Sequence, residues 1–172
     1  MHNKGNIYLW TGNGWGKTTS ALGVALRALG HGKKVSIIQF MKGRGNKIGE
    51  YRIRTKIPGY KIKQFGRYEW VNIKKPSEKD RELANKALEY AKAEAKKKPF
   101  LLVLDEINLA VAIGLLKEKD FISFLDEIDP KVHVYLTGRH ATAGLKKRAN
   151  YVNEIVMKKG PKKLIGEKGI DY

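Results

Sequence analysis

Residues 7–27 read IYLWTGNGWGKTTSALGVALR and decide the fold of this chain. Ile7 to Trp10 form a short apolar run typical of a strand, and Ala21 to Arg27 continue as a helix. The glycines between them let the backbone point its N–H groups at an anion, which the positive end of the helix also attracts. Lys17 adds a positive charge, and a neighbouring hydroxyl can hold Mg²⁺. The stretch therefore predicts a phosphate-binding loop that takes a nucleoside triphosphate.

The loop departs in one position from the usual G-x-x-x-x-G-K-[ST] pattern. Thr11 stands where the first glycine is expected, and Gly12 follows one position later. Strand, glycines, the Lys17-Thr18 pair and helix still come in the required order. We therefore prefer a ligand site to the alternative, a glycine-rich turn that binds nothing.

Length and composition bound the class of protein. The chain has 172 residues and no cysteine, which favours one domain and excludes disulfides, thiolate metal sites and cysteine nucleophiles. Its apolar runs are shorter than the ~18 residues of a membrane span, and the first strand begins too early for a signal peptide. We expect a single cytoplasmic α/β domain over residues 1–172 without membrane association.

The positive charge is concentrated in one part of the chain. The formal net charge is +18, and residues 33–75 hold 13 Lys and Arg against only Glu50 and Glu69. Such a segment favours an anionic partner, either a triphosphate or a nucleic acid. A solvated lysine-rich surface explains most of these side chains equally well, because no aromatic ladder or RNA-binding signature accompanies them.

Apolar runs and helical patterns alternate along the chain, and several runs are apolar throughout, as in strands covered on both faces. The fold class predicted is α/β, a P-loop NTPase-like, RecA-like, doubly wound and mainly parallel sheet with helices on both faces. The expected strands are 7–10, 35–40, 60–65, 100–104, 132–136 and 151–156. The expected helices are 17–29, one opened by Pro76-Ser77 and stopped at Pro99, and 108–116, 120–128 and 141–149.

The least regular stretch is the basic segment at about 41–75, which glycines and Pro58 interrupt repeatedly. It follows the second strand and should leave the sheet at the same edge as the phosphate loop. A long irregular loop in a compact domain is usually functional or disordered. We expect this segment to cover the substrate.

A second motif with catalytic potential is residues 100–106, FLLVLDE. A buried strand would carry Asp105 and Glu106 to the sheet edge where ligands of open α/β sheets bind, beside Lys17. One or both carboxylates should position Mg²⁺. In the alternative interpretation, Asp105 is a helix N-cap and Glu106 a first-turn acid.

Arg139 closes the next strand, in the run Leu136-Thr137-Gly138-Arg139. It should contact phosphate or substrate, unless it is an ordinary surface arginine. The histidines, at positions 2, 31, 133 and 140, form no pattern of a catalytic triad or a metal site.

Taken together, these motifs resemble one family, the P-loop ATP:corrinoid adenosyltransferases. The resemblance covers nearly the whole chain, and the shifted glycine of the loop is similar to the family's pattern. The matching segments are 11–19, 25–28, 30–32, 39–43, 49–50, 104–108, 136–139 and 168–172. It implies transfer of the 5′-deoxyadenosyl group of ATP to Co(I) of a reduced corrinoid, with release of triphosphate, in adenosylcobalamin biosynthesis or salvage.

The resemblance also implies roles for single residues. The catalytic residues would be Lys17, Thr18 and Glu106. The ligands of Mg²⁺ or Mn²⁺ would be Thr18, Asp105 and Glu106. The nucleotide-binding residues are Gly12, Asn13, Gly14, Trp15, Gly16, Lys17, Thr18, Thr19, Arg27 and Arg139. Trp15 departs from the family, which usually has a lysine there.

The corrinoid side of the site is expected on Trp70 first and Tyr68 second. Family members hold the corrinoid without its lower cobalt ligand, aided by aromatic residues, and this eases reduction to Co(I). The alternative is that Trp70 packs in the core. The resemblance further implies an electron-donating reductase and a homodimer.

Two other functions use the same loop. A P-loop phosphotransferase or NTPase would cleave ATP at phosphorus and release phosphate or diphosphate. A nucleic-acid-binding ATPase would follow from the net charge, and its binding would weaken steeply with salt. The resemblance favours the adenosyltransferase interpretation over both.

Overall fold

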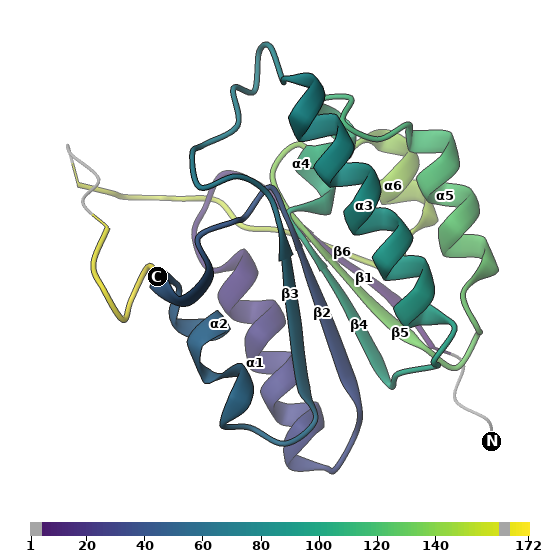
Figure 1. Ribbon diagram of the computed structural model, residues 1–172. Coiled ribbons are helices and arrows are strands. Elements are labelled where there is room, and N and C mark those ends of the chain that lie inside the picture. Colours follow the sequence, from purple (N-terminus) through teal and green to yellow (C-terminus); the bar gives the residue numbers. More distant parts are fainter. Residues whose placement is uncertain (1–4, 162–165) are drawn as a thin grey trace.

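A computed structural model describes residues 5–161 and 166–172 of the chain (Figure 1). Six strands form one sheet in the order β3-β2-β4-β5-β1-β6, and every neighbouring pair is parallel. The strands are β1 (Ile7–Thr11), β2 (Val35–Phe40), β3 (Tyr60–Phe65), β4 (Leu101–Asp105), β5 (His133–Thr137) and β6 (Tyr151–Glu154). The predicted parallel sheet is confirmed, with β2 and β3 at the predicted bounds and the other strands within two residues of them.

Helices cover both faces of this sheet, which confirms the doubly wound α/β class (Figure 1). One face packs against α1 (Lys17–Gly30), whose buried Ala21, Ala25 and Ala28 bring the helix close to the strands. The other face packs against α3 (Glu78–Ala95), α4 (Ile107–Ala112), α5 (Glu118–Glu127) and α6 (Ala143–Arg148). In the described part of the chain, none of these helices is long and apolar enough to span a membrane.

Helix α4 is shorter than the sequence predicted. It ends at Ala112, because Gly114 adopts a left-handed backbone with φ 71°. The N–H groups of Gly114 and Leu115 bond back to the carbonyls of Val111 and Ala110, at 3.0 and 2.9 Å. These two bonds form a Schellman motif, which closes the helix end.

Helix α3 starts where the sequence predicted, through a capping box. The hydroxyl of Ser77 accepts from the Asp80 N–H at 3.2 Å, and the Asp80 carboxylate accepts from the Ser77 N–H at 2.9 Å. Arg67 donates to the same carboxylate from the loop after β3, with Nε 2.9 Å from Oδ1. The cap therefore also fixes the loop that carries Tyr68 and Trp70.

The opposite end of α3 buries a second carboxylate, that of Glu94. It accepts hydrogen bonds from Ser36 of β2 at 2.9 Å and from Lys61 of β3 and Lys97 at 2.7 Å each. Burial by itself would raise the pKa of Glu94, but these donors hold it below its ordinary value. The cluster ties α3 to the strands at the end of the sheet remote from the phosphate loop.

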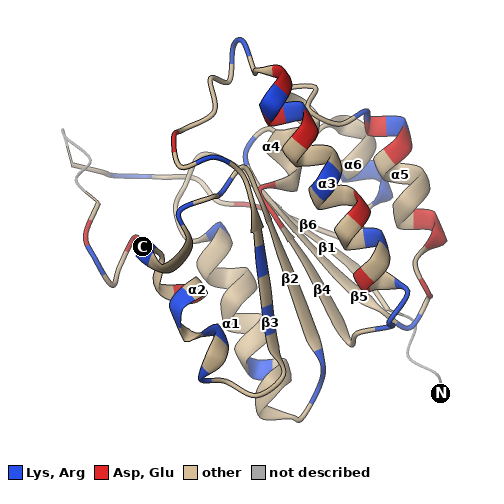
Figure 2. Ribbon diagram, in the orientation of Figure 1, with Lys and Arg blue, Asp and Glu red and all other residues tan. Residues whose placement is uncertain are grey.

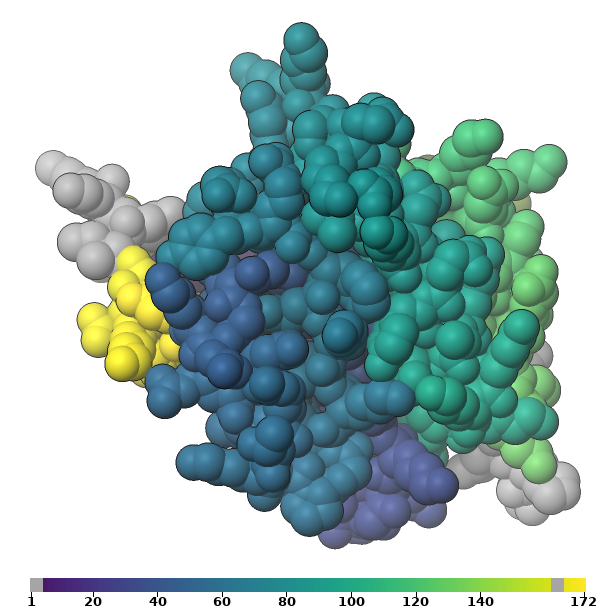
Figure 3. Space-filling model, viewed as in Figure 1, coloured from purple at the N-terminus to yellow at the C-terminus, as the bar shows by residue number. Residues whose placement is uncertain are grey.

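The basic segment 41–75 folds as short turns around α2 (Gly49–Arg52), between the 3-10 turns Gly45–Lys47 and Ile53–Thr55, and then enters β3. Acidic residues gather on α3 and α5, whereas the charged residues of this segment are mostly Lys and Arg (Figure 2). It lies beside the C-terminal residues 166–172 (Figure 3), and the two line an open groove of about 710 Å³. The cations of that groove are Lys47, Arg52, Arg54, Lys56 and Lys168.

Candidate active site

The candidate site lies where β1, β2, β4 and β5 end, at the carboxyl edge of the sheet (Figure 1). The phosphate loop joins β1 to α1 and rests on the chain that leaves β6. Gly14 N–H donates to the Ile155 carbonyl at 2.8 Å. Gly12 has φ 96°, and a Cβ there would lie 2.3 Å from the same carbonyl oxygen, so only glycine fits. The loop backbone is thus held in place by Ile155, just after β6.

Lys17 is the first residue of α1 and curls back over the loop. Its side chain is largely buried, and its ammonium donates to the carbonyl of Gly14. Burial lowers the pKa of Lys17, while the nearby carboxylate of Glu106 opposes that shift. A desolvated cation at the loop can bind a phosphate strongly.

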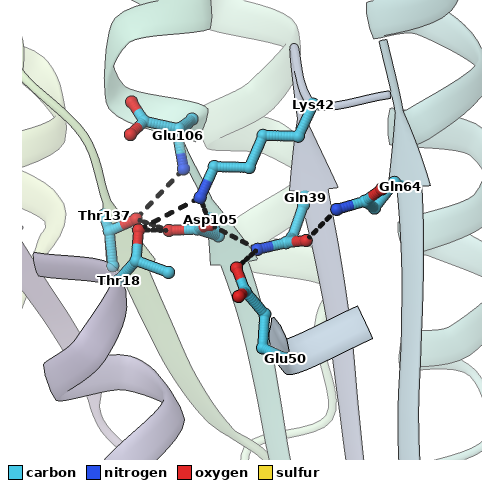
Figure 4. A network of polar contacts seen from close by, with 8 residues as sticks. All are labelled: Thr18, Gln39, Lys42, Glu50, Gln64, Asp105, Glu106 and Thr137. Carbon is cyan, nitrogen blue, oxygen red and sulfur yellow. Dashed lines mark hydrogen bonds and ion pairs between the residues drawn. The ribbon is translucent and has the colours of Figure 1, made fainter. Parts of the chain in front are cut away.

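Asp105, the last residue of β4, is the centre of the site (Figure 4). It is only 1% exposed, and each of its two oxygens accepts two hydrogen bonds. Oδ1 accepts from Thr18 Oγ1 at 2.9 Å and from Thr137 Oγ1 at 2.5 Å. Oδ2 accepts from Lys42 Nζ at 2.7 Å and from Gln39 Nε2 at 3.0 Å. The expected meeting of the loop with the acidic motif is present, through the Thr18 contact.

This set of donors keeps Asp105 ionised. Burial by itself would raise its pKa, but the charge and hydrogen bond of Lys42, with the two threonine hydroxyls, bring the pKa below its usual value. The N-cap alternative for Asp105 is wrong, because Asp105 belongs to β4 and the N-cap of α4 is Glu106.

Gln39 extends the network to the basic segment (Figure 4). This fully buried side chain also donates to Glu50 of α2 at 3.1 Å and accepts from Gln64 of β3 at 2.8 Å. Gln64 in turn accepts from the Gly45 N–H at 2.8 Å. The segment that was expected to cover the substrate is therefore hydrogen-bonded to the residues that surround Asp105.

Glu106 is held in an unusual conformation, with a left-handed φ of 64°. Its N–H donates to Thr137 Oγ1 at 3.0 Å, and its side chain makes no capping hydrogen bond to α4. Burial and the neighbouring Asp105 carboxylate raise the pKa of Glu106. Two carboxylates on successive residues at one site favour the binding of a cation.

With this geometry established, comparison with known proteins identifies the family. A family model described as ATP:corrinoid adenosyltransferase BtuR/CobO/CobP matches residues 3–172. The chain belongs to this family. It is 31% identical to a corrinoid adenosyltransferase of Pseudomonas aeruginosa over 98% of this chain and 84% of that protein. It is 31% identical to one of Escherichia coli (88% and 76% covered) and 33% to one of Sinorhizobium (92% and 75%).

The residues of this adenosyltransferase-family site fit a hard divalent cation. Thr18 Oγ1 and the Asp105 carboxylate are already in contact, and Glu106 follows directly. In residues 5–161 and 166–172, no three His, Asp or Glu side chains cluster as a complete metal cage. Mg²⁺ suits a site of this kind, because it is usually held by one or two carboxylates together with substrate phosphates and water.

Two arginines predicted to contact the nucleotide, Arg139 and Arg27, lie at different distances from the phosphate loop. Arg139 is exposed, but its charge is near enough to lower the pKa of Lys17. Arg27 lies in the last turn of α1, ten residues after Lys17, and that is about 15 Å along a helix. Arg27 therefore lies away from the phosphate loop, and its contact with the nucleotide stays a prediction.

The expected corrinoid residues form an exposed cluster with two cations. Trp70 is 80% exposed and Tyr68 53%, so the alternative that Trp70 packs in the core is wrong. The Arg44 guanidinium lies 4.4 Å from the Trp70 ring centroid and 5.8 Å from that of Tyr68. Lys47 Nζ donates to the Tyr68 hydroxyl at 3.1 Å. The two rings are available to a planar ligand.

The loop residues Asn13, Trp15 and Thr19 are also exposed. They are therefore accessible to a nucleotide, as the family pattern implies.

Three further side chains of this adenosyltransferase-family site were not predicted as site residues: Gln39, Lys42 and Thr137. Each lies in the last two residues of an apolar strand or just after it, at the same edge as the phosphate loop. A polar residue at the end of a buried strand was the available signal, as with Gln39 in the run VSIIQF.

Proposed function

We propose that this protein transfers the 5′-deoxyadenosyl group of ATP to Co(I) of a reduced corrinoid and releases triphosphate. The family match over residues 3–172 carries this proposal. Two substrates that react must bind side by side. The phosphate loop, the residues around Asp105 and the exposed pair Tyr68 and Trp70 belong to segments that contact one another, which suits this requirement. The corrinoid is a substrate, and Mg²⁺ or Mn²⁺ is the proposed metal.

In the proposed reaction, Co(I) attacks C5′ of the ATP ribose. A cobalt–carbon bond forms with the cobalt electron pair, and the C5′–O5′ bond breaks with its electrons on the departing triphosphate. Displacement at carbon by a strong nucleophile needs no general base, but it needs stabilisation of the charge that leaves. Lys17, the N–H groups of residues 12–16 and the N-terminus of α1 can provide that stabilisation.

The metal would be held by Thr18, Asp105 and Glu106, and it would neutralise part of the negative charge of the phosphates. Thr137 and Gln39 hold Asp105 in position by their hydrogen bonds. Arg139 and the cations of the basic segment attract the anionic substrate.

Trp70 and Tyr68 would lie against the lower face of the corrin and exclude an axial ligand from cobalt. Losing that ligand favours reduction of Co(II) to Co(I). The exposure of both rings supports this role, because a core aromatic could not reach a ligand. An electron-donating reductase would supply the electron, and the protein would act as a cytoplasmic homodimer.

One assay tests the proposed function. The protein is mixed with ATP, Mg²⁺ and chemically reduced corrinoid, and the products are separated. We expect a light-sensitive adenosylcorrinoid and inorganic triphosphate in equal amounts. Release of phosphate or diphosphate without a cobalt–carbon bond would instead support a P-loop phosphotransferase or NTPase.

A further inference from the structure

Lys42 places a positive charge at the point where the site would accept a metal ion (Figure 4). Its Nζ lies 2.7 Å from Asp105 Oδ2 and 3.2 Å from Thr18 Oγ1. Thr18 and Asp105 are two of the three side chains assigned to Mg²⁺ above. The ammonium therefore contacts the same hydroxyl and carboxylate that the metal would use.

The backbone of Lys42 is fixed, so its ammonium can change position only by rotation of the side chain. Met41 before it has a left-handed φ of 56°. A Cβ on Gly43 would lie 2.2 Å from the Gly66 carbonyl oxygen, and a Cβ on Gly66 would lie 2.4 Å from Lys42 N. The loops after β2 and β3 thus touch backbone to backbone. The flexible four-carbon stem of a lysine still allows its ammonium to take other positions.

An ammonium and a divalent cation cannot share the Asp105 carboxylate at these distances, because like charges a few ångströms apart repel strongly in a buried site. Lys42 must leave Asp105 when a metal binds there. Its side chain is 25% exposed, so the ammonium is not enclosed by the core. Asp105 would remain supported by Thr137 and Gln39.

We propose that Lys42 competes with the divalent cation for Asp105, and that the displaced ammonium becomes a second cation for the triphosphate beside Lys17. Lys42 then has two positions, one on Asp105 without ligands and one on the phosphates with them. The proposal rests on the triphosphate site of the proposed function and not on the corrinoid chemistry.

The first test titrates Mn²⁺ alone into the nucleotide-free protein and follows free Mn²⁺ by electron paramagnetic resonance. Lys42→Met removes the competing charge, and we expect Mn²⁺ to bind at least about tenfold more tightly than to the wild type. Lys61→Met is the matched control, because Lys61 Nζ also pairs at 2.7 Å with a buried carboxylate, that of Glu94, away from the loop. The control should leave Mn²⁺ affinity unchanged.

The second test measures binding of inorganic triphosphate in EDTA by calorimetry. Without metal, Lys42→Met should bind about tenfold more weakly than the wild type, because one cation is missing. Lys42→Gln keeps a hydrogen-bond donor for Asp105 without the charge, and it gives the same two readouts if the methionine variant does not fold.

Unchanged Mn²⁺ and triphosphate affinities in these variants would reduce Lys42 to a structural partner of Asp105 and overturn the proposal. Neither measurement contains a corrinoid. A protein that failed to transfer adenosyl groups would therefore leave this test intact.

Discussion

Trp70→Ala separates a corrinoid role from a structural role, and the structure sets the size of its effect on stability. The indole is 80% exposed and contacts the Arg44 guanidinium. An exposed cation–π contact contributes about 0.5–1 kcal/mol. For a domain of this size, a loss of about 1 kcal/mol lowers the Tm by about 2–4 °C. A buried tryptophan would instead cost about 3–5 kcal/mol when replaced by alanine.

The effect on activity should depend on the oxidation state of the supplied cobalt. Starting from Co(II) with a reductant of modest strength, Trp70→Ala should lose most of its activity, because the axial ligand is no longer excluded. Starting from preformed Co(I), it should retain most of it, since ligand removal is then unnecessary. The ATP affinity should stay near that of the wild type. Initial rates from both states, with a thermal melt of each protein, make the comparison.

Phe100→Ala is the matched control. Phe100 is also an exposed aromatic with a cation over its ring, Lys33 Nζ at 5.7 Å, but it lies just before β4 at the opposite end of the sheet. It should lower the Tm at least as much, because Phe100 is only 40% exposed and also packs on His133, and it should leave both rates unaffected. Equal losses from Co(II) and Co(I) in Trp70→Ala would refute the assignment of this residue to the cobalt site.

Three further perturbations test the rest of the site and the fold. Lys17→Ala should lower turnover by about 10²–10³-fold, or ~2–4 kcal/mol, in steady-state kinetics, because a desolvated cation at the leaving group is lost; an unchanged rate would contradict that contact. Asp105→Asn puts an amide where a buried carboxylate accepts four hydrogen bonds, and it should destabilise the fold by about 1–3 kcal/mol in urea unfolding, whereas a loss below ~0.5 kcal/mol would argue against the buried network. In the folded protein the pKa of Glu94 lies below its ordinary value of 4.5, because hydrogen-bond donors, Lys61 above all, outweigh the effect of burial. The stabilisation by the ionised carboxylate is therefore present above about pH 4.5 and is lost as the pH falls through the folded pKa. Unfolding of wild type and Glu94→Gln should therefore differ near neutral pH and converge in acid, and a constant difference would contradict the assignment.

Local sequence signals predicted the parts of the fold that depend on neighbouring residues. The phosphate loop, the bounds of β2 and β3 and the Ser77 cap each follow from a few consecutive residues, as does the delivery of Asp105 to the carboxyl edge. The partner of Asp105 did not follow, because Lys42 is 63 positions away and nothing near it marks a buried ion pair.

The exposure of Trp70 and the length of α4 were also harder to predict, because hydrophobic periodicity does not report on either. Trp70 stands in a loop without periodicity, so no pattern showed which way it faces. The early end of α4 depends on the left-handed Gly114, and its two backbone bonds are not visible in a count of apolar residues.

The backbone at Glu106 has a consequence for anyone who would engineer this protein. A side chain at φ 64° is strained by roughly 1–3 kcal/mol, and glycine at position 106 would remove that strain. A procedure that selects residues for thermal stability alone would therefore favour glycine or asparagine at position 106. Either choice would remove a carboxylate from the mouth of the phosphate site. Stabilised variants should accordingly be sought on the outer helices, with Glu106 left as it is.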